Sequence, residues 1–179
     1  DVVAKPIILV IMAIPVILAL LIMIPMLTET EIPSSAINPN DTIHIEYTKH
    51  DLRVVSFGVT EKTAAESTEI LLIKDDGSVQ YNKITEDGGQ SQIMSSINDE
   101  KLRKLTALIK ETGFMSIPKE SFPIQEDVTD YTKSTIKITL NGQKSQIFWP
   151  DQDSTDRLIP PIITMIESEL DEIVKQIIE

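Results

Sequence analysis

Residues 6–27, PIILVIMAIPVILALLIMIPML, form a run of 22 residues without a charged side chain. An α-helix rises about 1.5 Å per residue, so this run reaches about 33 Å and can cross the hydrocarbon core of a bilayer. The apolar region of a cleaved secretory signal is only about 7–15 residues long. The sequence therefore predicts a retained transmembrane anchor at residues 1–28.

The charges that flank this run predict its orientation. Lys5 precedes it, whereas Glu29 and Glu31 follow it. Because cytoplasmic flanks are enriched in Lys and Arg, we expect a single-pass protein of the cell membrane with a cytoplasmic N-terminus. The run contains no Gly, Ser or Thr, so the usual small-residue contacts and ion relays of membrane helices are missing from it. Its predicted role is anchoring in the lipid bilayer.

The remainder of the chain has the size of one domain. Residues 29–40 are rich in Pro, Ser and Glu and predict a linker, and residues 41–179 predict an extracytoplasmic domain. Asn40 begins an Asn-Asp-Thr glycosylation sequon, which is used only where this side of the membrane faces out. These assignments describe a tethered domain.

Alternating apolar residues predict six strands. The pattern places them at residues 43–48 and 53–59, in a hairpin over 69–84 that turns at Asp76-Gly77, and in a hairpin over 134–149 that turns at Asn141-Gly142. The polar stretches 60–69 and 85–92 are expected to be loops.

Two helices are expected as well. Asn98 is a good N-cap and Gly113 a good stop for the first, and Pro161 suits the first turn of the second. Because the strands are joined mostly by hairpins, the fold class is predicted to be α+β. It combines one N-terminal transmembrane helix with a mostly antiparallel β-sheet domain that carries two helices.

The charge and composition exclude some functions. The formal net charge is −12, and it belongs to the domain, because residues 6–27 carry none. An acidic domain is repelled by phosphate backbones, so no nucleic-acid partner is expected. The chain has no Cys, no Gly-x-Ser-x-Gly motif and no Gly-rich phosphate loop. We therefore predict that it is not an enzyme.

Metal binding stays open as an alternative. The chain has two histidines, in the stretch HIEYTKHD, where His44 and Glu46 share one face of a strand. If a turn follows, His50 or Asp51 returns toward them and completes a set of nitrogen and oxygen ligands for Cu or Zn. Solvent-facing polar residues on a strand give the same pattern. No other cofactor is expected.

Two resemblances extend this interpretation. The run ILLIKDDGSVQYNKI, the helix NDEKLRKLTALIKETGF and the hairpin TDYTKSTIKITLNGQKSQI resemble an uncharacterised domain of exported prokaryotic proteins. That resemblance implies an exported location and no known activity.

The plan of one Ile-rich span and a small acidic outer domain is similar to that of accessory subunits of archaeal membrane complexes, notably archaeal ammonia monooxygenase. This resemblance implies a non-catalytic accessory subunit of a copper membrane monooxygenase, with integral-membrane subunits as partners. The alternative is a membrane-tethered module that binds Cu, Zn or another ligand.

Overall fold

The computed structural model describes residues 38, 40–57 and 60–179. The chain divides after Ser34, and the described residues belong to the second unit, Ser35–Glu179. The predicted anchor and most of the predicted linker lie outside the described residues. Within the described ranges, no helix has the length and hydropathy needed to cross a membrane.

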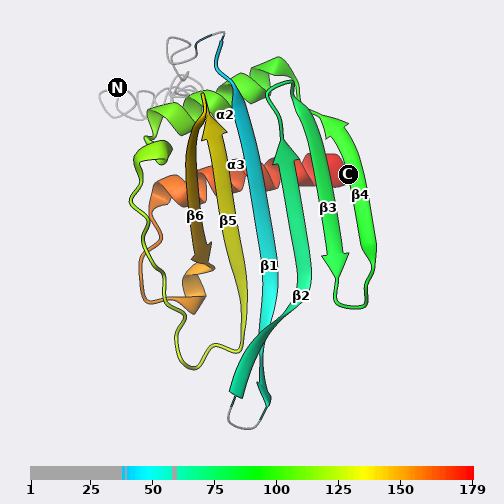
Figure 1. Ribbon diagram of the computed structural model, residues 1–179, viewed down its shortest axis with the longest axis vertical. Helices are drawn as coiled ribbons and strands as arrows, with labels where there is room; N and C mark the ends of the chain where they lie inside the picture. The colour runs from blue at the N-terminus through cyan, green and yellow to red at the C-terminus, as the bar shows by residue number, and fades with distance from the viewer. Residues whose placement is uncertain (1–37, 39, 58–59) are drawn as a thin grey trace, which may run out of the picture. The chain divides into compact units, whose positions relative to one another are not determined.

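An antiparallel sheet and two α-helices make up the described unit, which confirms the α+β class. The sheet runs in the order β4-β3-β2-β1-β5-β6, and every neighbouring pair is antiparallel (Figure 1). The elements are β1 (Ile43–Phe57), β2 (Thr60–Ile73), β3 (Ser78–Thr85), β4 (Gln90–Ser96), α2 (Asp99–Glu111), η2 (Phe114–Ser116), β5 (Asp130–Leu140), β6 (Gln143–Pro150), η3 (Gln152–Ser154) and α3 (Pro161–Ile178).

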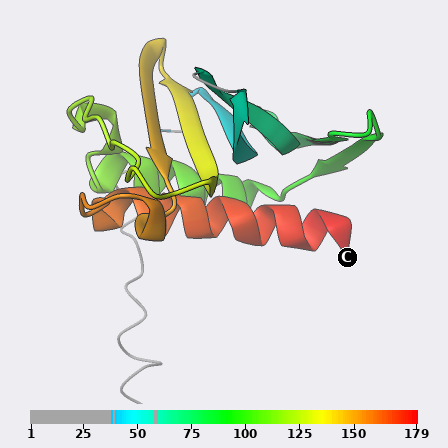
Figure 2. The ribbon, with the colours of Figure 1, turned by 90° about the horizontal axis from the view of Figure 1, so that it is seen from below.

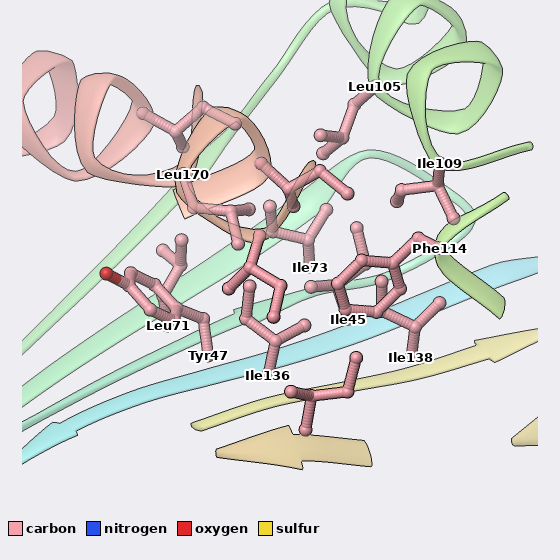
Figure 3. Packing of buried hydrophobic residues seen from close by; sticks show 14 of the residues in the cluster. Ile45, Tyr47, Leu71, Ile73, Leu105, Ile109, Phe114, Ile136, Ile138 and Leu170 are labelled. Atoms are coloured by element: carbon pink, nitrogen blue, oxygen red, sulfur yellow. The ribbon is translucent and has the colours of Figure 1, made fainter. Parts of the chain in front are cut away.

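Both helices lie on the same face of the sheet (Figure 2). The core fills the space between the layers, and Figure 3 shows aliphatic side chains of the central strands meeting Leu105 and Ile109 of α2 and Leu170 of α3. Ile45 in β1 is fully buried, and its partners across the ladder, Ile73 and Ile138, are fully buried too. The sheet therefore presents one apolar face to the helices.

The predicted helix start and the hairpin turns are confirmed. The side chain of Asn98 accepts a hydrogen bond from the backbone N–H of Lys101 at 2.8 Å, as an N-cap does. In the first hairpin turn, Gly77 has φ +77°, and a side chain at this position would place its Cβ 2.7 Å from the carbonyl oxygen of Ile97. The second hairpin turns at Asn141 and Gly142, both with positive φ.

The strand predicted at residues 53–59 is confirmed for 53–57, but the turn predicted before it and the loop predicted at 60–69 are wrong. No turn interrupts β1, and the expected loop is the first part of β2, which pairs with it. Arg53 forms ion pairs with Glu66 and with Asp130, its neighbour across the ladder to β5. This end of the hairpin is solvated, so its strands are specified by backbone pairing and polar cross-strand contacts, and the apolar alternation fades.

The predicted loop at residues 85–92 is too long. The turn ends at Gly89, and β4 begins at Gln90 as the edge strand beside β3. Only Ile93 of this strand is partly buried. An edge strand packed on few neighbours needs few apolar residues, so its sequence carries no clear strand period. The predicted number of strands is nevertheless right, because one missed strand replaces one that was wrongly divided.

Candidate functional site

The two described helices leave the opposite face of the sheet uncovered, and Figure 1 looks onto it. Successive side chains of a strand point to opposite faces, so the residues that alternate with the core point outward here. We call this surface the open face. Its residues are His44, Glu46, Thr48, His50, Thr68, Ile70, Leu72, Gln80, Asn82, Ile84, Gln92, Met94, Lys133, Thr135, Lys137, Thr139, Lys144, Gln146 and Phe148.

Large apolar side chains are exposed on the open face. Phe148 is 46% exposed, Ile84 40% and Met94 67%. Ile70 and Leu72 of β2 are half-buried among them. In a strand with one solvated face, inward apolar residues alternate with outward polar residues. In β2 the residues from 70 to 73 are apolar on both faces of the sheet. Exposed apolar side chains that share one face indicate an interaction surface.

The open face is also cationic along β5 and β6. Lys133, Lys137 and Lys144 point outward there, and Glu46 is the acidic residue of the face. Glu46 lies 3.4 Å from the amine of Lys137. The amine of Lys133 lies 5.2 Å from the ring centroid of Phe148, a cation–π contact. Positive charge and aromatic surface are therefore adjacent.

The predicted metal ligands are placed on this face, with one exception. His44, Glu46 and His50 point outward from β1, whereas Asp51 points to the other side and accepts hydrogen bonds from Ser67 at 2.5 Å and Thr132 at 2.9 Å. The turn expected after residue 48 does not exist, because β1 continues.

The continuous strand keeps the two histidines apart. His44 and His50 are six residues apart, which corresponds to about 20 Å along a strand. Among the residues that the structure describes, no three His, Asp or Glu side chains are grouped closely enough to hold a metal ion. The candidate ligands therefore share a face without converging on one point.

His50 illustrates the electrostatics of the open face. Its Nδ1 lies 2.9 Å from the hydroxyl of Thr68 on β2. Partial burial lowers the pKa of His50, and the nearby ammonium of Lys133 lowers the pKa further, although Asp51 opposes the shift. At neutral pH the imidazole is uncharged, so the positive charge of the face comes from lysine.

A polar cluster lies on the helix side of the sheet, and sequence reasoning missed it. Glu167 of α3 accepts hydrogen bonds from Trp149 at 3.1 Å, Ser134 at 3.0 Å and Tyr47 at 3.3 Å. Asp171 accepts from Tyr47 at 2.8 Å. Burial raises the pKa of Tyr47, and the negative charge of Glu167 raises it further. This cluster fixes α3 on the sheet.

A signal for this cluster was available in the sequence. Glu167 follows Ile163 by four residues and precedes Leu170 by three, so it lies within the apolar stripe of α3. An acidic residue on a buried stripe requires hydrogen-bond donors from the layer it packs against. The outward direction of the β5 lysines could also have been predicted from the sequence, because they alternate with Ile136 and Ile138.

Two hollows mark the described surface beside α2, away from the open face. One has a volume of about 260 Å³ between α2 and α3 and is lined by charged residues such as Lys101 and Glu172. The other, about 170 Å³, is lined in part by Asp41 and Arg103. Both are smaller than the roughly 300–1,000 Å³ of typical small-molecule sites. The open face is therefore the stronger candidate, and a macromolecule is the ligand class that a broad sheet surface suits.

No protein-family model matches the chain, and no curated protein matches it either.

Proposed function

We propose that the chain is a non-catalytic accessory subunit of a membrane protein complex. Residues 6–27 anchor it in the cell membrane with the N-terminus in the cytoplasm, and the domain at residues 41–179 lies outside. The open face docks against extracytoplasmic parts of larger integral-membrane subunits. The resemblance of the plan to accessory subunits of archaeal ammonia monooxygenase makes a copper membrane monooxygenase of that type the candidate complex.

The observation that carries this proposal is the exposure of apolar side chains on the side of the sheet opposite α2 and α3, the helices of the described part of the chain. Phe148 and Ile84 are each at least 40% exposed although they belong to paired strands. Phe148 lies on the edge strand β6 and Ile84 on β3, so the face offers exposed apolar groups at two separate places, each of the kind that protein interfaces bury. The polar threonines and glutamines around them match the rim of such an interface.

The metal-binding alternative has weaker support. The two histidines lie at separate positions of β1, and Asp51 lies on the opposite face of the sheet. A ligand set for Cu or Zn must converge within about 2.0–2.3 Å of one ion. The docking part of the accessory-subunit proposal uses a surface that the described residues form, and its membrane anchor rests on the apolar sequence at residues 6–27.

The proposal is tested by extracting native membranes with a gentle detergent and separating the complexes on a native gel. Mass spectrometry then identifies the proteins that migrate with the full-length chain. We expect a stoichiometric integral-membrane partner. Phe148→Asp should abolish migration with the partner, because it replaces the exposed aromatic group on the β6 side of the face by a charge. Leu158→Asp is the matched control, since Leu158 is 79% exposed in a loop outside the open face.

Migration of the wild-type chain alone would refute the proposal. Equal loss of the partner in Phe148→Asp and Leu158→Asp would place the docking surface elsewhere. Circular dichroism of both variants shows whether either loss arises from unfolding.

A further inference from the structure

The charge of the open face opposes the charge of the chain. The chain carries 28 acidic against 16 basic residues and has a formal net charge of −12. On the β1, β5 and β6 part of the open face, the balance is reversed: Lys133, Lys137 and Lys144 stand against Glu46. A local sign opposite to that of the molecule affects which partner surfaces approach productively.

Lysines on the helix side of the sheet are paired within the domain. Lys49 lies 2.7 Å from Asp171, Lys83 2.7 Å from Glu69 and Lys110 2.6 Å from Asp41. These contacts show that the fold has enough carboxylates to neutralise the cations that face its own core layer.

Two lysines of the open face differ. Within the described ranges, neither Lys133 nor Lys144 forms an ion pair. Lys133 lies over the ring of Phe148 and lowers the pKa of the neighbouring His50. Its charge thus lies beside Phe148, the exposed aromatic group on the edge strand β6. Lys144, the second residue of β6, is exposed.

We infer that the open face binds an acidic protein segment of the partner subunit, whose Asp or Glu carboxylates pair with Lys133 and Lys144 while an apolar side chain packs on Phe148. This inference rests on the proposed function and adds the chemistry of the partner. Charge complementarity selects the acidic class, and Phe148, the exposed apolar side chain between the two lysines, selects a protein surface. An anionic lipid surface is disfavoured, because it repels the remainder of a domain that carries the net charge of −12.

The direct test is zero-length cross-linking of the full-length chain in native membranes. A carbodiimide joins a lysine amine to a carboxylate only where the two are in contact, and mass spectrometry of the extracted complex identifies the joined peptides. We expect Lys133 and Lys144 to be joined to Asp or Glu of another protein. Lys104 and Lys119, exposed on α2 and in the following loop, serve as internal controls and should stay unjoined.

Charge reversal gives a second measurement. Lys133→Glu combined with Lys144→Glu should weaken partner retention at least about tenfold, the effect of roughly 1.4 kcal/mol. Lys104→Glu combined with Lys119→Glu changes the net charge equally and should change retention less than about twofold, because rim charges far from a contact act weakly. The retention of the wild-type chain should also fall as salt is raised.

The outcomes separate this inference from the proposed function. A wild-type chain that migrates without any partner refutes the proposed function itself. If the chain retains its partner but Lys133 and Lys144 are cross-linked to no partner carboxylate, the inference of an acidic partner segment is refuted. The proposed function is then unaffected. Cross-links from these lysines to carboxylates of a second, isotope-labelled copy of the chain would show self-association. That result would also refute the inference.

Discussion

Replacement of Glu167 should be among the most destabilising single changes on α3. Its carboxylate accepts hydrogen bonds from Trp149, Ser134 and Tyr47, and all three donors belong to residues that are at most 3% exposed. The amine of Lys49 lies 3.8 Å from the same carboxylate. The side chain therefore joins the helix to β1, β5 and β6 through one acceptor group.

The magnitude follows from the donors that Glu167→Ala leaves without a partner. A hydrogen bond to a charged group contributes about 1.5–3 kcal/mol, and an unpaired buried donor costs a similar amount. Tyr47 keeps its bond to Asp171, so the indole N–H of Trp149 and the hydroxyl of Ser134 account for most of the loss. The Glu167 side chain is 21% exposed, which lets water compensate in part. We expect a decrease of about 3 kcal/mol in the free energy of unfolding.

Glu167→Gln separates hydrogen bonding from packing. The amide oxygen can accept from Trp149, and the amide nitrogen can donate to the hydroxyl of Ser134. The expected decrease is only about 1 kcal/mol, because shape and most hydrogen bonds are kept. Glu172→Ala is the control on the same helix, since that side chain is 59% exposed, and it should change stability by less than about 0.5 kcal/mol.

The assay is urea unfolding of the fragment 35–179, followed by tryptophan fluorescence and by circular dichroism. Trp149 is the one tryptophan of the chain and contacts Glu167 directly, so its emission reports the perturbed region. Circular dichroism gives a free energy of unfolding that does not depend on that local environment. A Glu167→Ala variant within 0.5 kcal/mol of wild type, or a Glu167→Gln variant as unstable as Glu167→Ala, would refute this reasoning.

Three further predictions concern other contacts. The Lys110 amine beside Asp41 holds the pKa of that carboxyl below its usual value, so its stabilisation is present at neutral pH and is lost as the pH falls through the lowered pKa. Asp41→Asn should cost about 1.5–3 kcal/mol at pH 7 and less at pH 3 in urea unfolding, and an equal cost at both pH values would contradict this account. The pKa of His50 is lower in the folded than in the unfolded chain, so stability should decline as the pH falls below about 6.5. His50→Gln should reduce that slope, which urea midpoints measured from about one unit above to about one and a half units below the usual imidazole pKa would show. Gly77→Ala should lower the free energy of unfolding more than Gly88→Ala. Both positions have positive φ, but only a Cβ at position 77 would meet a carbonyl oxygen, at 2.7 Å. Equal losses in urea unfolding would show that the backbone conformation alone determines the cost.

Sequence patterns were reliable where local chemistry and burial agreed. Asn98 caps α2 as predicted, because its side chain needs only the first turn of its own helix. The Asn141-Gly142 turn is equally local. The turn before residue 53 and the loop at 60–69 were predicted wrongly, because the pairing partner of this part of the β1–β2 hairpin is not visible in the local sequence.

The candidate site shows the same division. The alternation in β1 correctly put His44 and Glu46 on one face, and the continuous strand adds His50 to it. Their convergence into a metal site depended on a turn after residue 48, and strand pairing with β2 and β5 keeps this segment extended instead. The open face itself was not predicted, because it exists only once both helices pack on the same side of the sheet.

The sequence by itself determined the local features: a 22-residue apolar segment, the periods of the paired strands and helices, and their caps and turns. Each depends on residues that are close together in the chain. Tertiary structure decided which strands are neighbours, that α2 and α3 cover one face, and that Lys133, Lys144 and Phe148 share the other. Those results depend on contacts between distant segments, because the apolar stripes of the helices and the inward side chains of the sheet can be buried together in only a few arrangements.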